Sequence, residues 1–194
     1  MNRLPPHARS SQGFTLTELA VVLVVIALVL GGLLSPLATQ MDVRMTAETR
    51  KDLADIREAL LGFAVINGRL PCPADAKSVS GAAGAGEEVP VGGPCLNDSG
   101  VVPWVTLGVP ETDAWGQRYS YRVTPAFAQR QSSPARAVFD LRTPGTLDVR
   151  SAAAGAMVAG GLPVVVVSHG GNGRGGYNRQ GVQLPGGEVA DEVD

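Results

Sequence analysis

His169 is one of only two histidines in this chain of 194 residues, and it directly follows Ser168. A serine and a histidine could act as the nucleophile and the general base of a hydrolase. The two residues, however, follow a run of valines typical of a β-strand, in which adjacent side chains point to opposite faces. We therefore expect no hydrogen bond between Ser168 and His169, and the sequence predicts that the protein is not an enzyme.

Glycines dominate the next segment, residues 170–176. A glycine-rich loop can bind a phosphate, but a P-loop also needs a Lys-Ser/Thr pair with a helix behind it, and the sequence has neither. The formal net charge is −2, from 16 Lys and Arg against 18 Asp and Glu. This charge does not favour a nucleic-acid partner, so none is expected.

The C-terminal part of the chain carries a group of oxygen-bearing side chains: Asn172, Glu188, Asp191, Glu192 and Asp194. Carboxylate and amide oxygens are hard ligands of the kind that Ca²⁺ prefers. Two interpretations stay open, a calcium site formed by these residues or an acidic tail that is simply solvated.

The elements that must position these residues begin with an apolar block near the N-terminus. No charged residue occurs between Leu19 and Met41, and about 20 apolar residues in a helix cross the roughly 30 Å of a bilayer core. Arg3 and Arg9 precede the block, and acidic residues follow it. By the positive-inside rule, we expect residues 14–41 to cross a membrane once, with the N-terminus in the cytoplasm.

Glu18 lies at the cytoplasmic edge of this block. An unpaired carboxylate in lipid is costly, so such a residue usually marks a function with a partner. The alternative is that Glu18 extends to the lipid headgroups. A cleaved secretory signal peptide is disfavoured, because the residues after Leu34 fit its cleavage site poorly.

Beyond Met41 the apolar residues recur every three or four positions, which predicts an amphipathic helix that ends at Asn67-Gly68. We expect one continuous helix over residues 14–66, with residues 42–66 as its amphipathic half. Candidate strands follow at residues 101–107, 118–124, 136–142, 146–150 and 163–168, with a hairpin turn at residues 143–145. The pattern predicts an α+β fold, in which a small antiparallel sheet of a head, residues 67–194, packs on the amphipathic half-helix.

Cys72 and Cys95 are too few for a cysteine-rich zinc site, and their spacing fits no ligand motif. In a head exported to an oxidising compartment, a disulfide between them is expected. Two free buried thiols remain the alternative.

Residues 11–19, Ser-Gln-Gly-Phe-Thr-Leu-Thr-Glu-Leu, resemble the processing site of type IV prepilins and type II secretion pseudopilins. The resemblance implies that residues 1–13 are a leader, and that prepilin peptidase cleaves after Gly13 and methylates the new N-terminus at Phe14. In that family the glutamate that corresponds to Glu18 is thought to pair with the N-terminal amine of a neighbouring subunit. One departure is that Pro36 lies one residue later than the usual helix proline.

Residues 110–121 are similar to the Pro-x-x-Asp-x-Trp-Gly-x-x-Tyr-x-Tyr segment of the major pseudopilins, and we expect a purely structural role for them. The glycine loop and the Gly-Gly-Glu and Ala-Asp strings near the C-terminus also resemble the calcium-binding segments of that family. Asn172 stands where the family usually has Asp.

The resemblance implies a structural subunit of a type II secretion or type IV pilus filament. It would be held in the bacterial inner membrane with a periplasmic head until it assembles, and its partners would be prepilin peptidase and other pilin or pseudopilin subunits. The alternative is a membrane-anchored minor pilin or adhesin-like module that captures DNA or a surface ligand.

Overall fold

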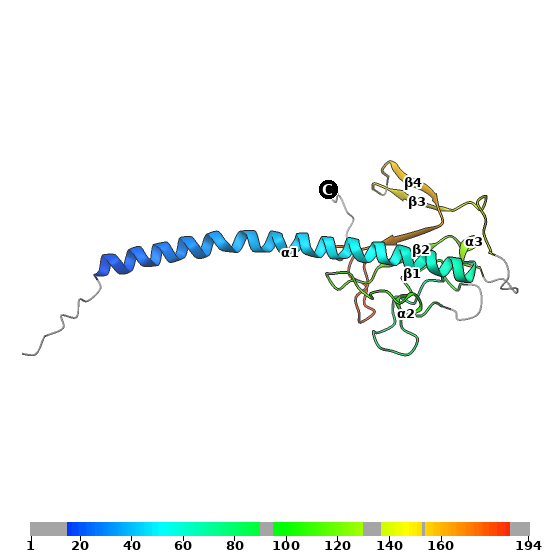
Figure 1. Ribbon diagram of the computed structural model, residues 1–194, viewed down its shortest axis with the longest axis horizontal. Coiled ribbons are helices and arrows are strands. Elements are labelled where there is room, and N and C mark those ends of the chain that lie inside the picture. Colours follow the sequence, from blue (N-terminus) through cyan, green and yellow to red (C-terminus); the bar gives the residue numbers. More distant parts are fainter. Residues whose placement is uncertain (1–14, 90–94, 130–136, 153, 187–194) are drawn as a thin grey trace, which may run out of the picture. The chain divides into compact units, whose positions relative to one another are not determined.

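The computed structural model describes residues 15–89, 95–129, 137–152 and 154–186, and for residues 30–39 it describes the backbone only. The helices and strands follow one another along the chain as shown in Figure 1. In order they are α1 (Leu16–Asn67), β1 (Ser99–Val101), α2 (Trp104–Leu107), β2 (Ser120–Val123), α3 (Pro125–Ala128), β3 (Leu147–Arg150), β4 (Met157–Leu162) and β5 (Val164–Val167). A long N-terminal helix followed by short antiparallel strands confirms the α+β class.

Helix α1 has 52 residues. It begins after Thr15, whose hydroxyl accepts a 3.3 Å hydrogen bond from the amide of Glu18, as an N-cap residue does. It ends where Gly68 takes a φ of 64°, a left-handed conformation that glycine adopts without a steric penalty. The helix is continuous through Pro36, so the predicted long helix is confirmed within the described residues.

The chain divides into two units, Met1–Val43 and Arg44–Asp194. In the first unit every described side chain from Thr15 to Val29 is exposed, and most of them are apolar. Among the residues whose side chains the structure describes, no helix is both apolar enough and long enough to cross a membrane.

In the second unit, a three-stranded antiparallel sheet packs against the C-terminal part of α1 (Figure 1). Strand β2 is central, so that Tyr121 lies opposite Gly100 of β1 and Val166 of β5. Tyr121 and Val123 point to the helix and form a core with its Ile56 and Leu60. The predicted packing of a small sheet on the amphipathic half-helix is therefore observed.

The predicted hairpin around residues 143–145 is wrong. Strand β3 pairs instead with β4, a strand that was not predicted, and Leu147 lies opposite Leu162. Residues 137–146 form no strand, because the carboxylate of Asp140 accepts hydrogen bonds from the amide of Arg142 (2.8 Å) and the hydroxyl of Thr143 (3.2 Å). Such local side-chain bonds stabilise a turn in competition with a sheet ladder.

The predicted strand at residues 101–107 is also wrong over most of its length. Strand β1 ends at Val101, and helix α2 follows directly after Pro103. Gly108, with a φ of 68°, ends α2 and donates its amide to the carbonyl of Trp104. The β-branched residues of this segment favoured a strand, but proline at the start and glycine at the end fix a short helical turn.

Candidate functional site

The N-terminal site predicted from the sequence is described only in part. Gly13 and Phe14 lie outside the described residues, whereas Glu18 is exposed in the first turn of α1. Thr15 and Glu18 have the spacing of a capping box, and a carboxylate in the first turn interacts favourably with the positive end of the helix dipole. The position of Glu18 thus suits the start of the helix, independently of any role in assembly.

Cys72 and Cys95 are joined by a disulfide, with their Cα atoms 5.3 Å apart. The amide of Cys72 donates to Oε2 of Glu88 (3.1 Å), which also accepts from Arg69 (2.8 Å). The side chains of Arg69 and Glu88 are only 7% and 8% exposed and form a bidentate pair. In so dry a position the pair requires its additional hydrogen bonds. Together with the disulfide, it ties residues 69–72 to Glu88 and Cys95 next to the end of α1.

The segment that resembles the pseudopilin Asp-x-Trp-Gly string is built around Asp113, which is 5% exposed. One carboxylate oxygen accepts from the amides of Trp115 (3.0 Å) and Gln117 (2.9 Å), and the other accepts from the hydroxyl of Ser168 (2.6 Å). Gly116, with a φ of 83°, completes the turn. These bonds indicate the structural role expected for residues 110–121.

Arg118 is a second polar centre of the head, and its side chain is fully buried. Its guanidinium donates to the carboxylate of Glu111 (2.8 and 3.1 Å) and to the carbonyl oxygens of Ser78 (2.7 Å) and Arg179 (3.2 Å). It also lies 4.7 Å from the centre of the Trp104 ring, a cation–π distance. A lone arginine in a strand-like segment gives no sign of burial, so this centre could not be predicted from the sequence.

Two buried tyrosines face α1 from the sheet. Burial raises the pKa of Tyr119 above its ordinary value, and Asp52, whose carboxylate accepts a 3.1 Å hydrogen bond from the phenol, raises it further. Burial also raises the pKa of Tyr121, whose hydroxyl donates to the carbonyl of Pro71 (2.9 Å). Both phenols are therefore neutral donors that hold the sheet and the following loop against the helix.

His169 does not bond to its neighbour Ser168, as the alternation of side chains on a strand predicts. It contacts Ser120 of β2 instead, with 2.7 Å between Oγ of Ser120 and Nε2 of His169. Nδ1 of His169 lies 2.8 Å from the carbonyl oxygen of Arg174. No sequence pattern predicts this pair, since 49 positions separate the two residues and only the sheet register brings them together.

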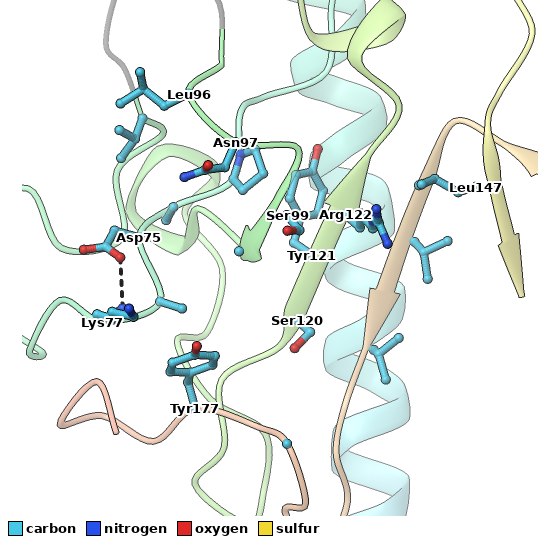
Figure 2. A pocket seen from close by; sticks show the side chains of 18 of the residues that line it. Asp75, Lys77, Leu96, Asn97, Ser99, Ser120, Tyr121, Arg122, Leu147 and Tyr177 are labelled. Carbon is cyan, nitrogen blue, oxygen red and sulfur yellow. Dashed lines mark hydrogen bonds between the residues drawn. The ribbon is translucent and has the colours of Figure 1, made fainter. Parts of the chain in front are cut away.

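A cavity of about 920 Å³ lies on the outer face of the β1-β2-β5 sheet. Figure 2 shows Ser120 on β2 directed to this side, with Tyr177 across from it on the C-terminal loop. Val165 and Val167 of β5 supply apolar surface, and Lys77 and Arg122 add polar groups to the lining. The head therefore presents an open, partly apolar hollow beside the Ser120–His169 pair.

Only one of the five residues expected to bind Ca²⁺ lies within the described residues. This residue is Asn172, whose side-chain oxygen accepts a 3.0 Å hydrogen bond from the amide of Arg174. The four acids Glu188, Asp191, Glu192 and Asp194 are outside the described part of the chain. Within that part, no group of three His, Cys, Asp or Glu residues is placed to hold a metal ion.

The family model of the prokaryotic N-terminal methylation motif matches residues 8–34, a range that contains Gly13, Phe14 and Glu18. No protein of curated function and no solved structure matches the chain. Residues 8–34 thus carry the prokaryotic N-terminal methylation motif, the signature of type IV pilins and pseudopilins.

Proposed function

We propose that this protein is a pilin-like structural subunit of a filament, either the pseudopilus of a type II secretion system or a type IV pilus. The methylation motif over residues 8–34 carries the proposal, because its family is structural rather than enzymatic. The motif implies assembly with other pilin subunits. Helix α1 begins within the motif and continues without a break to Asn67, so it supplies the kind of continuous element on which such subunits pack.

Before assembly, residues 14–41 hold the subunit in the bacterial inner membrane, with the head in the periplasm. The uncharged sequence between Leu19 and Met41 supports this, as do the exposed apolar side chains between Leu16 and Val29. Water disfavours so much contiguous apolar surface, whereas lipid or the core of a filament would cover it. In this proposal residues 1–13 are a leader, residues 42–66 are the amphipathic half-helix and residues 67–194 are the head.

Processing creates the functional N-terminus. Prepilin peptidase cleaves after Gly13 and methylates Phe14, which leaves Glu18 four residues along the helix. The carboxylate of Glu18 then pairs with the N-terminal amine of a neighbouring subunit. A carboxylate drawn into an apolar bundle is destabilising unless a cation meets it, so this pairing favours one axial register between subunits.

Intact-mass analysis of membrane-extracted protein, made with and without a co-expressed prepilin peptidase, tests the proposal. The mass should fall to that of a chain that begins at N-methylated Phe14 only when the peptidase is present. Gly13→Leu should keep the full mass, and Gly68→Leu, a change at a glycine outside the motif, should still be processed. A mature mass in the Gly13 variant would refute the site.

A second candidate is an adhesin-like binding module that shares this N-terminus and captures a surface ligand. The cavity of about 920 Å³ on the head favours a ligand, whereas the net charge of −2 argues against DNA. A variant whose cavity is filled, for example Ser99→Trp, distinguishes the two candidates when both its incorporation into filaments and its ligand binding are measured. A filament subunit tolerates the change, and a binding module loses its ligand.

Calcium binding by the C-terminal segment also remains a proposal. It rests on the oxygen ligands of Asn172, Glu188, Asp191, Glu192 and Asp194 and on their resemblance to the pseudopilin segments.

A further inference from the structure

The hydrogen bonds of His169 determine which of its ring nitrogens carries the proton. Its Nδ1 faces the carbonyl oxygen of Arg174 at 2.8 Å, and a carbonyl oxygen can only accept. The neutral ring must therefore carry its proton on Nδ1, which leaves the lone pair of Nε2 directed at the hydroxyl of Ser120, 2.7 Å away. In this tautomer Ser120 donates to His169, the arrangement of a nucleophile with its general base.

The ring is also held in place by glycine backbone. A Cβ atom at Gly176 would lie only 3.0 Å from Cγ and Cδ2 of His169, so the main chain packs directly on the imidazole. Gly175, next to it, has a φ of 74°, and a Cβ there would lie 3.9 Å from Cε1 of the ring. A larger residue at position 176 would displace the imidazole from Ser120. The loop thus positions the base independently of the two hydrogen bonds.

Ser120 is accessible from the cavity. It lies between Tyr119 and Tyr121, which are buried toward the helix, so its own side chain is on the outer face of β2 (Figure 2). The cavity lining around it includes Val165, Val167 and the ring of Tyr177. This combination of a hydroxyl with nearby apolar surface suits a small ester whose acyl chain lies on the valines.

We propose that Ser120 is an activated nucleophile with His169 as its general base, and that it takes up an acyl group from a carboxylic ester bound in the cavity. Oγ of Ser120 attacks the carbonyl carbon and forms the new C–O bond while its proton passes to Nε2 of His169. The bond to the leaving oxygen then breaks, and the alcohol departs with the proton from Nε2. The product is an acyl ester on Ser120, a covalent modification that goes beyond the role of a filament subunit.

Ser99 provides an internal reference. It lies on β1, lines the same cavity and is open to the same reagents, but the ring of His169 bonds to Ser120 instead. A difference in reactivity between the two serines therefore measures the effect of His169 on Ser120 and does not depend on access to the cavity. Trypsin separates them, because Arg118 and Arg122 flank Ser120 and leave Ser99 on another peptide.

The test treats the purified full chain, in detergent, with diisopropyl fluorophosphate and, separately, with p-nitrophenyl butanoate. Peptide mass spectrometry with fragmentation then measures the adducts on each serine over time. Ser120 should react about 10²-fold faster than Ser99, and His169→Gln should reduce the rate at Ser120 by about the same factor, as expected for loss of a general base. Ser120→Ala should remove the adduct from its peptide, and Ser99→Ala should leave it.

Equal rates at Ser120 and Ser99 in the unaltered protein would overturn the proposal, as would an unchanged rate in His169→Gln. Adducts from the fluorophosphate but none from the ester would overturn the assignment of an acyl donor. Since His169→Gln can also loosen the glycine loop, the comparison of the two serines in the unaltered chain decides the question without any variant. A purely structural hydrogen bond would change the melting temperature in Ser120→Ala but would give no selective labelling.

Discussion

The hydroxyl of Ser168 lies 2.6 Å from Oδ2 of Asp113, a residue 55 positions earlier in the chain. This bond joins the residue that follows β5 to the turn that precedes β2. Because Asp113 also accepts from the amides of Trp115 and Gln117, one carboxylate closes the turn and fixes the end of the sheet. The charge on Asp113 strengthens each of these bonds.

Asp113→Ala should lower the free energy of unfolding of the head by about 3 kcal/mol, because three donors lose a charged acceptor in a site that is nearly closed to water. Ser168→Ala should have a smaller effect, about 1 kcal/mol, since only one bond is lost. Asp55→Ala is the matched control, an exposed acid paired with Lys51. Urea titration followed by tryptophan fluorescence measures all three, and equal effects of Asp113→Ala and Asp55→Ala would refute the role of the Asp113 turn.

Glu18→Ala should reduce incorporation into filaments while leaving the melting temperature of the head unchanged. The residue is exposed and lies in the first unit of the chain, so it contributes nothing to the core of the second. Thr15→Ala is the control, because it removes the N-cap hydroxyl but keeps the carboxylate of Glu18. The N-cap hydroxyl stabilises the end of the helix by about 1 kcal/mol. Cell fractionation with filament isolation measures the outcome. If Glu18→Ala assembles normally, the carboxylate acts only at the start of the helix.

Reduction of the Cys72–Cys95 disulfide should destabilise the head by about 3 kcal/mol, since the bond closes a loop of 23 positions in the unfolded chain. Thiol alkylation of periplasmic material without reductant, read by mass, should find no free thiol. Cys95→Ser should expose one reactive thiol only after unfolding, because Cys72 is fully buried. Two alkylated cysteines in the native protein would contradict the pairing.

Alkaline pH should destabilise the head. The pKa values of Tyr119 and Tyr121 are raised above the unfolded value of 10.0, so their protonated forms are favoured by folding. The contribution of these two tyrosines to the free energy of unfolding is fully present below about pH 10 and decreases as the pH rises above it. Absorbance from the Tyr119 and Tyr121 tyrosinates should therefore appear late and together with unfolding. In Tyr119→Phe, the part of the pH dependence of stability that comes from the contact with Asp52 should disappear. Ionisation of Tyr119 and Tyr121 near pH 10 in the folded protein would contradict their burial.

Calcium at about 10⁻³ M should raise the melting temperature of the full chain if the C-terminal segment binds it. Asp191→Ala and Glu188→Ala should each abolish the shift, whereas Asp140→Ala, at an acid outside the proposed ligand set, should not. Calorimetric titration with Ca²⁺ and with Mg²⁺ measures the binding. No response to Ca²⁺ would assign the acids to a solvated tail.

The long helix could be predicted from the sequence because its signals are local. The uncharged apolar block, the amphipathic periodicity beyond Met41 and the stop at Asn67-Gly68 predicted a helix over residues 14–66, within two residues of the observed Leu16–Asn67. The α+β class followed from the order of the elements. Cysteine pairing followed from the expected compartment, and it agrees with the disulfide in the structure.

The errors occurred where contacts between distant segments decide the structure. Residues 137–142 have the composition of a strand, but the partner that would have paired with them, β3, pairs with β4. The same reason explains why Ser120 was not predicted as the partner of His169. Ser168 was the histidine's neighbour in sequence, yet the antiparallel register of β2 and β5 brings Ser120 to the ring.

Arg118 has a consequence for any redesign of the cavity. Its guanidinium holds the carbonyls of Ser78 and Arg179, which belong to the two loops that carry the lining residues Lys77 and Tyr177. The two loops are therefore mechanically coupled through a side chain that itself lies outside the lining. The main chain joins the same loops, because the amide of Ser80 donates to the carbonyl of Arg179 (2.8 Å), so a change in the width of the entrance would require loss of this bond as well as of the Arg118 bonds.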